Sequence, residues 1–121
     1  MARVLVVDDA VFIRMTIKRI LEANGHEMVG EAITGSEAVE KYEELKPDLV
    51  LLDISMPEMS GIDALQKIMQ MDSDARVIIC SALGQQEFVA KAIEMGARDF
   101  IVKPFEASLF VEALEKVLNQ K

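Results

Sequence analysis

Short apolar runs alternate along the chain with longer segments in which apolar residues recur every three or four positions. Four of the short runs are continuous, which is typical of parallel strands covered on both faces of a sheet. They are Val4–Val7, Leu49–Leu52, Val77–Cys80 and Phe100–Val102. A fifth run, Met28–Ala32, is more polar, and we expect it to form a strand at an edge of the sheet.

The segments between these runs have the spacing of amphipathic helices. The apolar face of the first helix consists of Ile13, Ile17, Ile20 and Leu21, and that of the last helix of Phe110, Val111, Leu114, Val117 and Leu118. The first helix should end at Asn24-Gly25, because glycine readily adopts the left-handed conformation that ends many helices.

Three further helices are indicated by residues typical of helix ends. Thr34 followed by Glu37 forms a capping box, which predicts the start of a second helix that ends before Pro47. Ser60 is the expected N-cap of a third helix. A fourth helix should cover Gln85–Met95.

Strand and helix thus alternate five times, which predicts an α/β fold. Because crossovers between parallel strands are right-handed, we expect a doubly wound, flavodoxin-like (βα)₅ sheet with strand order 2-1-3-4-5. The 121 residues are enough for one domain with a core. Since no linker, repeat or low-complexity segment interrupts them, we expect one domain over residues 1–121 and no output domain.

Charge and composition narrow the classes of function. A net charge of −8 argues against binding to nucleic acid, because the protein would not displace counterions from a phosphate backbone. The same charge disfavours an anionic membrane surface. The apolar run near the N-terminus is too short for a signal peptide or a membrane span. We therefore expect a cytoplasmic protein.

The single cysteine and the single histidine are not expected to carry chemistry. Cys80 lies in an apolar run and has no partner for a disulfide, so it should be a small buried apolar residue. His26 lies between Gly25 and Glu27 in a predicted turn. We expect its side chain to be exposed to solvent.

Charged residues follow three of the predicted strands. Asp8-Asp9 follow the first, Asp53 the third and Lys103-Pro104 the fifth. Because the carboxyl ends of parallel strands converge on one crevice, we expect these side chains to meet there. Three clustered carboxylates repel one another and favour Mg²⁺, which often shares its shell with a phosphoryl oxygen. Taken singly, Asp8-Asp9 would also suit a helix N-terminus and Lys103 a solvated surface, but together they predict a phosphoryl-transfer site.

The same landmarks, in this order, resemble the receiver domain of two-component response regulators. They are Asp8-Asp9, Asp53 within LVLLDISMPEMSG, Ser81-Ala82, and Phe100 with Lys103-Pro104-Phe105. The resemblance covers the whole chain. Within the family, the segments DDAVFIRMTIKRIL, GEAITGSEAVEKYEELKPD and CSALGQQ are most similar to the chemotaxis regulators.

The resemblance implies a role for each residue of the site. Asp53 would be the phosphoacceptor, a carboxylate nucleophile that carries the phosphoryl group as a mixed anhydride. Asp9 would bind Mg²⁺ directly and Asp8 would lie close by or act through a water. Asp53 and the backbone carbonyl of Ser55 would complete the protein ligands. Lys103 would pair with a phosphoryl oxygen, aimed inward by a cis bond to the proline that follows it.

The resemblance also implies a conformational switch. Ser81 would move to donate a hydrogen bond to the phosphoryl group and so vacate space for the ring of Phe100. The turning ring would alter the surface formed by the fourth helix, the fifth strand and the fifth helix. Many relatives have tyrosine in place of Phe100, so burial of the ring is retained here but a hydroxyl contact with a partner is lost.

The implied function is that of a single-domain chemotaxis response regulator. A histidine kinase would phosphorylate it, the flagellar motor switch would bind the phosphorylated form, and a phosphatase would act on it. It would catalyse its own Mg²⁺-dependent phosphorylation and dephosphorylation without being a conventional enzyme.

Three alternatives stay open at this point. The chain could be a phosphorelay intermediate that passes its phosphate to a histidine-phosphotransfer protein. It could be a flavodoxin-like FMN carrier, although Asp8-Asp9 would repel the phosphate of FMN unless a metal intervened. It could also be a pseudo-receiver or a consensus scaffold that keeps the site without a pathway.

Overall fold

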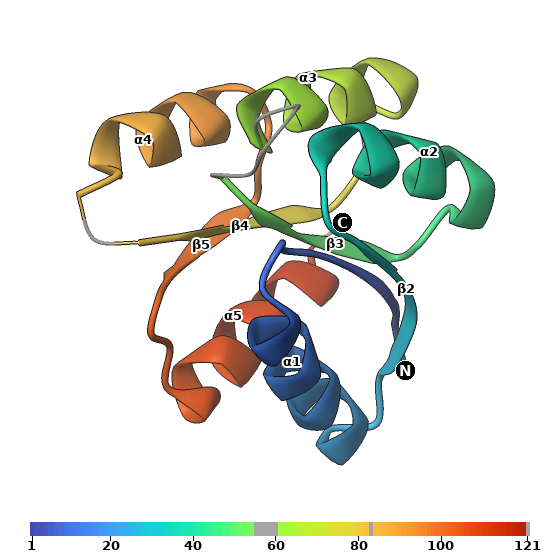
Figure 1. Ribbon diagram of the computed structural model, residues 1–121, viewed down its shortest axis with the longest axis vertical. Helices are drawn as coiled ribbons and strands as arrows, with labels where there is room; N and C mark the ends of the chain where they lie inside the picture. The colour runs from blue at the N-terminus through green and yellow to red at the C-terminus, as the bar shows by residue number, and fades with distance from the viewer. Residues whose placement is uncertain (55–60, 83, 121) are drawn as a thin grey trace.

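A computed structural model describes residues 1–54, 61–82 and 84–120. Five parallel strands form one sheet in the order β2-β1-β3-β4-β5, as predicted (Figure 1). The strands are β1 (Arg3–Val7), β2 (Glu27–Ala32), β3 (Leu49–Asp53), β4 (Val77–Ser81) and β5 (Asp99–Val102). The more polar run lies at one edge of the sheet, as expected.

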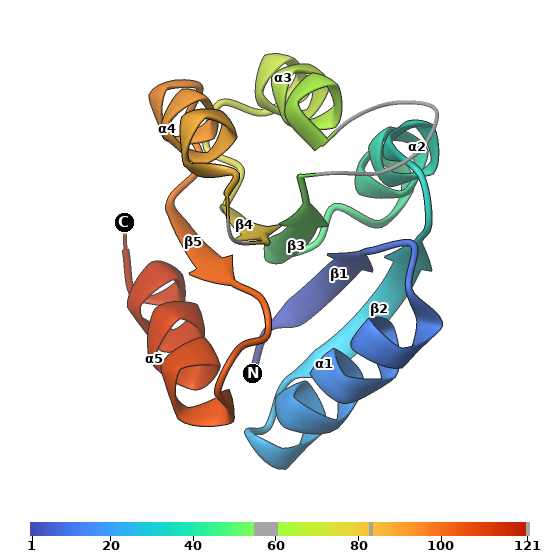
Figure 2. The ribbon, with the colours of Figure 1, turned by 60° about the vertical axis from the view of Figure 1, so that its left-hand side comes forward.

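Helices cover both faces of this sheet. They are α1 (Val11–Ala23), α2 (Gly35–Leu45), α3 (Gly61–Met71), α4 (Gln86–Glu94) and α5 (Ala107–Leu118). One face carries α1 and α5, and the other carries α2, α3 and α4 (Figures 1 and 2). Among the helices of the described residues, none is both long and apolar enough to cross a membrane.

The core consists of two apolar clusters, one on each face of the sheet. Alternate residues of β1 point to opposite clusters: Val4 and Val6 pack with α1 and α5, whereas Leu5 and Val7 pack with α2 and α3. The strands β3 and β4 are buried along their whole length, which explains their continuous apolar sequence. Cys80 lies in this core as predicted, and burial raises the pKa of its thiol to about 12.

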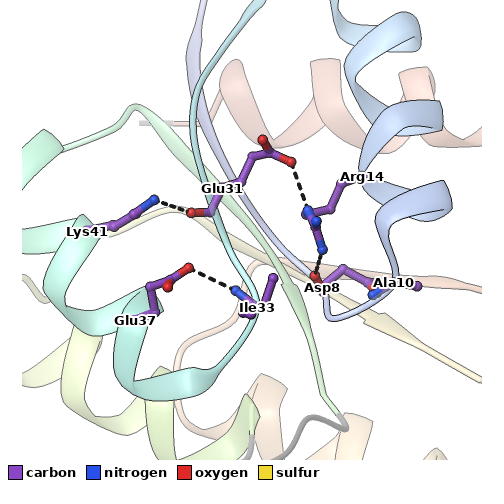
Figure 3. Close-up of polar contacts among 7 residues, drawn as sticks. All are labelled: Asp8, Ala10, Arg14, Glu31, Ile33, Glu37 and Lys41. Atoms are coloured by element: carbon purple, nitrogen blue, oxygen red, sulfur yellow. Dashed lines mark hydrogen bonds and ion pairs between the residues drawn. The ribbon is translucent and has the colours of Figure 1, made fainter.

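Most helix ends follow the signals in the sequence. Thr34 caps α2 by accepting a hydrogen bond from the backbone N–H of Glu37 at 3.1 Å. The carboxylate of Glu37 accepts from the backbone N–H of Ile33, one residue before the expected donor (Figure 3). The first helix ends as predicted before Gly25, whose φ is 79°. The predicted N-cap Ser60 lies outside the described residues.

His26 is buried, so the expectation that it would be exposed to solvent was wrong. The backbone N–H of Ala2 donates to His26 Nδ1 at 2.9 Å. Because Nδ1 is therefore an acceptor, Nε2 carries the proton and donates to the carboxylate of Glu115 at 2.8 Å. Glu115 lies in α5, 89 residues away, and local sequence around the turn carries no sign of this contact.

Candidate functional site

Three carboxylates meet at the carboxyl edge of the sheet. Asp8 directly follows β1 and Asp53 ends the neighbouring strand β3, and both side chains are buried. Asp9 is the next residue of the loop and is exposed. One carboxylate oxygen from each of the three lies within 4.8 Å of the others. The structure thus brings together the three aspartates predicted as metal ligands.

Lys103 follows β5 and joins the same cluster. Its Nζ lies 2.5 Å from Asp8 Oδ2 and 3.4 Å from Asp53 Oδ2. Burial lowers the pKa of Lys103, but the hydrogen bond to Asp8 and the charges of the two aspartates together raise it above its ordinary value of 10.5. The ammonium is therefore charged at neutral pH and offsets part of the negative charge of the cluster. The bond between Lys103 and Pro104 is cis, as expected.

Asp8 is held by contacts with three different elements. Its backbone N–H donates to the carbonyl of Ala32 in β2 at 3.0 Å. Its Oδ1 accepts from the backbone N–H of Ala10 at 2.9 Å, and its backbone carbonyl accepts from Arg14 Nη1 at 2.6 Å (Figure 3). Nothing in the sequence distinguishes Arg14 as part of the site, because an arginine on a surface helix is normally a solvated residue.

Gly61 lets the first turn of α3 approach the end of β3. A Cβ atom on Gly61 would lie 2.3 Å from the carbonyl oxygen of Asp53 and 2.5 Å from the Cα of Ile54. Both atoms belong to the backbone, so a larger residue would displace the strand end that carries Asp53. The sequence shows this glycine only as part of the segment LVLLDISMPEMSG, and the close approach itself appears in the structure.

Ser81 and Phe100 lie on the neighbouring strands β4 and β5, Ser81 at the carboxyl end of its strand and Phe100 opposite Ile79. Ser81 ends β4, is buried, and its carbonyl accepts from the backbone N–H of Lys103 at 2.6 Å. Phe100 in β5 is 45% exposed. Both residues line a groove of about 520 Å³ between α4 and β5. Phe100 also lines a second groove, of about 500 Å³, between β5 and α5.

The donor set of the cluster fits a small, hard divalent cation. All three aspartates offer carboxylate oxygens, which Mg²⁺ prefers, and Mg²⁺ needs only one or two carboxylates because it keeps several waters. The ammonium of Lys103 offsets one of the three carboxylate charges, and the remaining charge suits a dication. The backbone carbonyl of Ser55, the fourth expected ligand, lies outside the described residues.

Comparison with known families agrees with this arrangement. Residues 4–115 match the family described as the response regulator receiver domain. The chain belongs to this family. Receiver domains bind Mg²⁺ at an acidic pocket, and Asp8, Asp9 and Asp53 form an acidic group of that kind.

Relatives place the chain among the chemotaxis members of the family. It is 61% identical to the chemotaxis protein CheY of Thermotoga maritima over 115 residues, and this aligned region covers 95% of this chain and 96% of that protein. It is 60% identical over 117 residues to CheY of Bacillus subtilis, which covers 97% of this chain and 98% of that protein. The protein is a CheY-like response regulator, which confirms the resemblance seen in the sequence.

A solved structure of a relative has the same fold. The crystal structure of the CheX–CheY–BeF₃–Mg²⁺ complex from Borrelia burgdorferi matches with a TM-score of 0.93 and 39% identity, over 98% of this chain and 90% of that chain. The doubly wound receiver fold predicted from the sequence is therefore confirmed both by the strand order and by this similarity.

Proposed function

We propose that this protein accepts a phosphoryl group on Asp53 and that the flagellar motor switch binds the phosphorylated form. One observation carries the proposal. The buried carboxylate of Asp53 ends the central strand of the sheet within 4.8 Å of the oxygens of Asp8 and Asp9, and 3.4 Å from the ammonium of Lys103. A nucleophile, candidate metal ligands and a fixed cation thus lie together.

The transfer itself is a substitution at phosphorus. A carboxylate oxygen of Asp53 forms a bond to the phosphorus of a phosphohistidine on the kinase, and the P–N bond breaks. The electron pair of that bond stays on the imidazole nitrogen, and the ring, which carries a proton on its other nitrogen, leaves as neutral histidine. Asp53 then holds the phosphoryl group as an acyl phosphate. Positioning and charge neutralisation provide most of the acceleration in such transfers.

Asp8, Asp9 and Asp53, with the backbone carbonyl of Ser55, would hold Mg²⁺. Its chemistry is charge neutralisation at the phosphoryl oxygens. Asp9 is the exposed member of the three and faces the solvent from which the ion and the donor arrive. Lys103 supplies the second positive charge, and its contact with Asp8 keeps that charge at the site before phosphorylation.

Ser81 and Phe100 would convert the modification into a change of surface. The hydroxyl of Ser81 would donate to the phosphoryl group, and the ring of Phe100 would turn toward the space that this movement opens. The shared groove between α4 and β5 supports this assignment, because both residues line it. The exposure of Phe100 agrees with the unphosphorylated position of the ring.

The proposed partners follow from the relatives. Chemotaxis proteins of the CheY type support a chemotaxis histidine kinase as donor and the motor switch as target. The complex of a related CheY with CheX supports a regulatory partner, which we propose to be a phosphatase. A cytoplasmic location would give the protein access to all of them.

A phosphorelay role is the second candidate, and one observation favours it. Val11, Phe12 and Met15 are exposed apolar residues of α1 close to the loop that carries Asp9. A helical phosphotransfer protein could dock on them and take the phosphate from Asp53. An FMN carrier is disfavoured, because the acidic cluster stands where the phosphate of FMN would bind.

Intact mass spectrometry after incubation with acetyl phosphate and Mg²⁺ tests the proposal. The protein should gain one phosphoryl group, and Asp53→Asn should gain none. Asp48→Asn is the matched control, because Asp48 lies at the opposite end of the sheet and accepts from the backbone N–H of Arg3. A mass shift that persists in Asp53→Asn, or that forms equally well in EDTA, would contradict the proposal. A pull-down with the motor switch protein then tests the target.

A further inference from the structure

A series of polar contacts links Arg14 of α1 to the loop after β1 and, through Glu31 of β2, to α2 (Figure 3). Arg14 in α1 donates from Nη1 to the backbone carbonyl of Asp8 at 2.6 Å and from Nε to the carboxylate of Glu31 at 2.8 Å. Lys41 in α2 donates to the backbone carbonyl of Glu31 at 2.6 Å. The side chain of Arg14 is only 13% exposed, so these contacts hold its guanidinium in one orientation.

The contact with Arg14 completes the hydrogen bonding of Asp8. The backbone N–H of Asp8 donates to Ala32, Oδ1 accepts from Ala10, and Oδ2 accepts from Lys103. The remaining polar group is the backbone carbonyl, and Arg14 is its donor. Because a buried carbonyl without a donor is rare in folded proteins, Arg14 satisfies a group for which the described residues offer no other donor.

The carbonyl of Asp8 belongs to the planar peptide that joins Asp8 to Asp9. A donor that holds this plane in place restricts the rotations about ψ of Asp8 and φ of Asp9, and so restricts the directions in which the two aspartate side chains leave the backbone. We propose that Arg14 is a positioning residue, which holds the Asp8–Asp9 peptide so that both carboxylates face a divalent cation. The inference rests on the proposed function, since the metal site belongs to that function.

When Arg14 is removed, the loss of its charge and the loss of its positioning role should change the affinity for Mg²⁺ in opposite directions. The guanidinium is a cation close to a cation site, so its loss makes the site more negative and by charge alone tightens the binding of Mg²⁺. Loss of positioning weakens binding, and removing a residue that orients metal ligands typically costs about 10- to 100-fold in metal affinity. The direction of the change therefore separates the two effects.

Calorimetric titration of metal-free protein with MgCl₂ measures this direction. Arg14→Ala should weaken Mg²⁺ binding by about 10-fold or more. Arg14→Lys keeps a donor of similar reach and should restore part of the affinity. Arg3→Ala is the matched control, because Arg3 donates to the backbone carbonyls of Leu45 and Lys46, both at 3.0 Å, at the far end of β1. It should lower stability and leave Mg²⁺ binding unchanged.

The outcomes distinguish the inference from the proposed function. If the wild-type protein binds no Mg²⁺, the proposed function fails and the inference with it. If the wild type binds Mg²⁺ and folded Arg14→Ala binds it equally well or more tightly, the inference alone is overturned. An equal loss of affinity in Arg3→Ala also overturns it, because the effect is then one of general stability.

A further variant covers the case in which Arg14→Ala does not fold, which thermal unfolding in EDTA would reveal. Arg14→Lys keeps the positive charge but replaces the planar guanidinium, which contacts both Asp8 and Glu31, with a single ammonium. It should weaken Mg²⁺ binding relative to the wild type, whereas Arg3→Lys should not, and because the charge is retained the loss reports positioning. Unchanged binding in folded Arg14→Lys would overturn the inference.

Discussion

At the scale of single residues, the site places three negatively charged side chains close together, two of them buried. Asp8 and Asp53 are buried at the ends of paired strands, and Asp9 lies close enough for its carboxylate to share the same 4.8 Å cluster. Lys103 offsets part of the repulsion by its contact with Asp8. Without a bound cation this charge arrangement is repulsive and works against the stability of the fold.

Asp9→Asn should raise stability when no metal is present. The substitution removes one charge from an exposed side chain of nearly the same shape, so repulsion falls and packing does not change. Gains of about 0.5–2 kcal/mol are typical where a functional site is relieved in this way. Urea unfolding in EDTA should show the gain, and the same comparison in Mg²⁺ should show a smaller one, because the cation already compensates the wild type.

Glu22→Gln is a suitable control for that measurement. Glu22 is an exposed acid of α1 outside the cluster, and surface changes of this kind usually stay within about 0.5 kcal/mol. A loss of stability in Asp9→Asn would mean that the carboxylate of Asp9 supports the loop in the metal-free state.

At the scale of secondary structure elements, His26 joins three segments at the end of the sheet away from the acidic site. Ala2 precedes β1, His26 precedes β2, and Glu115 belongs to α5. The bond from the backbone N–H of Ala2 to the imidazole is buried, whereas the side chain of Glu115 is 47% exposed. The two contacts of one ring should therefore differ in their contribution to stability.

His26→Leu should destabilise the fold by about 1–3 kcal/mol, because it leaves the buried N–H of Ala2 without an acceptor. Glu115→Gln should cost about 1 kcal/mol or less, since the carbonyl of glutamine can still accept the hydrogen bond from Nε2 at a site where the Glu115 side chain is half-exposed. Equilibrium unfolding in urea compares the two variants. Equal losses would show that the contact with Glu115, rather than the buried bond from Ala2, carries the contribution of His26 to stability.

The elements themselves could be predicted because burial on both faces leaves a clear sign in the sequence. A strand such as β3 must be apolar throughout, and parallel strands must bring their carboxyl ends to one edge, so Asp8, Asp53 and Lys103 were expected together. The contact of Arg14 could not be predicted in the same way. Lys18 and Arg19 are cations of the same helix, and no spacing rule separates Arg14 from them.

At the scale of the whole molecule, β4 and β5 connect the acidic site to an outer surface. The two strands pair directly, with Ser81 opposite Val102 and Ile79 opposite Phe100. Phe100 stands between two grooves, one beside α4 and one beside α5. If a new hydrogen bond from Ser81 to a phosphoryl group moved the ring of Phe100, both grooves would therefore change. The helix α2 lies beside β2, at the opposite edge of the sheet from β5 (Figure 2).

Activation should accordingly change the surface of α4, β5 and α5. Beryllofluoride with Mg²⁺ mimics the phosphorylated state, and the backbone amide signals of Gln86–Glu94, Asp99–Val102 and Ala107–Leu118 should shift more than those of α2. A peptide from the motor switch protein should bind the activated form more tightly and shift the same signals. Ser81→Ala should still bind beryllofluoride but should lose most of the change at Phe100, because the hydroxyl that couples the site to the ring is missing.

The phosphorelay alternative predicts that different backbone amide signals shift when a partner is added. A phosphotransfer protein would contact the exposed apolar residues of α1, Val11, Phe12 and Met15, together with the loops around Asp53. The shifts on adding a partner would then lie on α1, and Ser81→Ala would leave partner binding intact. If the motor switch peptide fails to bind the activated protein while a phosphotransfer protein binds through α1 and accepts the phosphate, the motor target is wrong. We expect the shifts on α4, β5 and α5 rather than on α1. Ser81 and Phe100 line one groove, and this arrangement would let the surface of the protein change on phosphorylation, which a protein that only relays phosphate does not need.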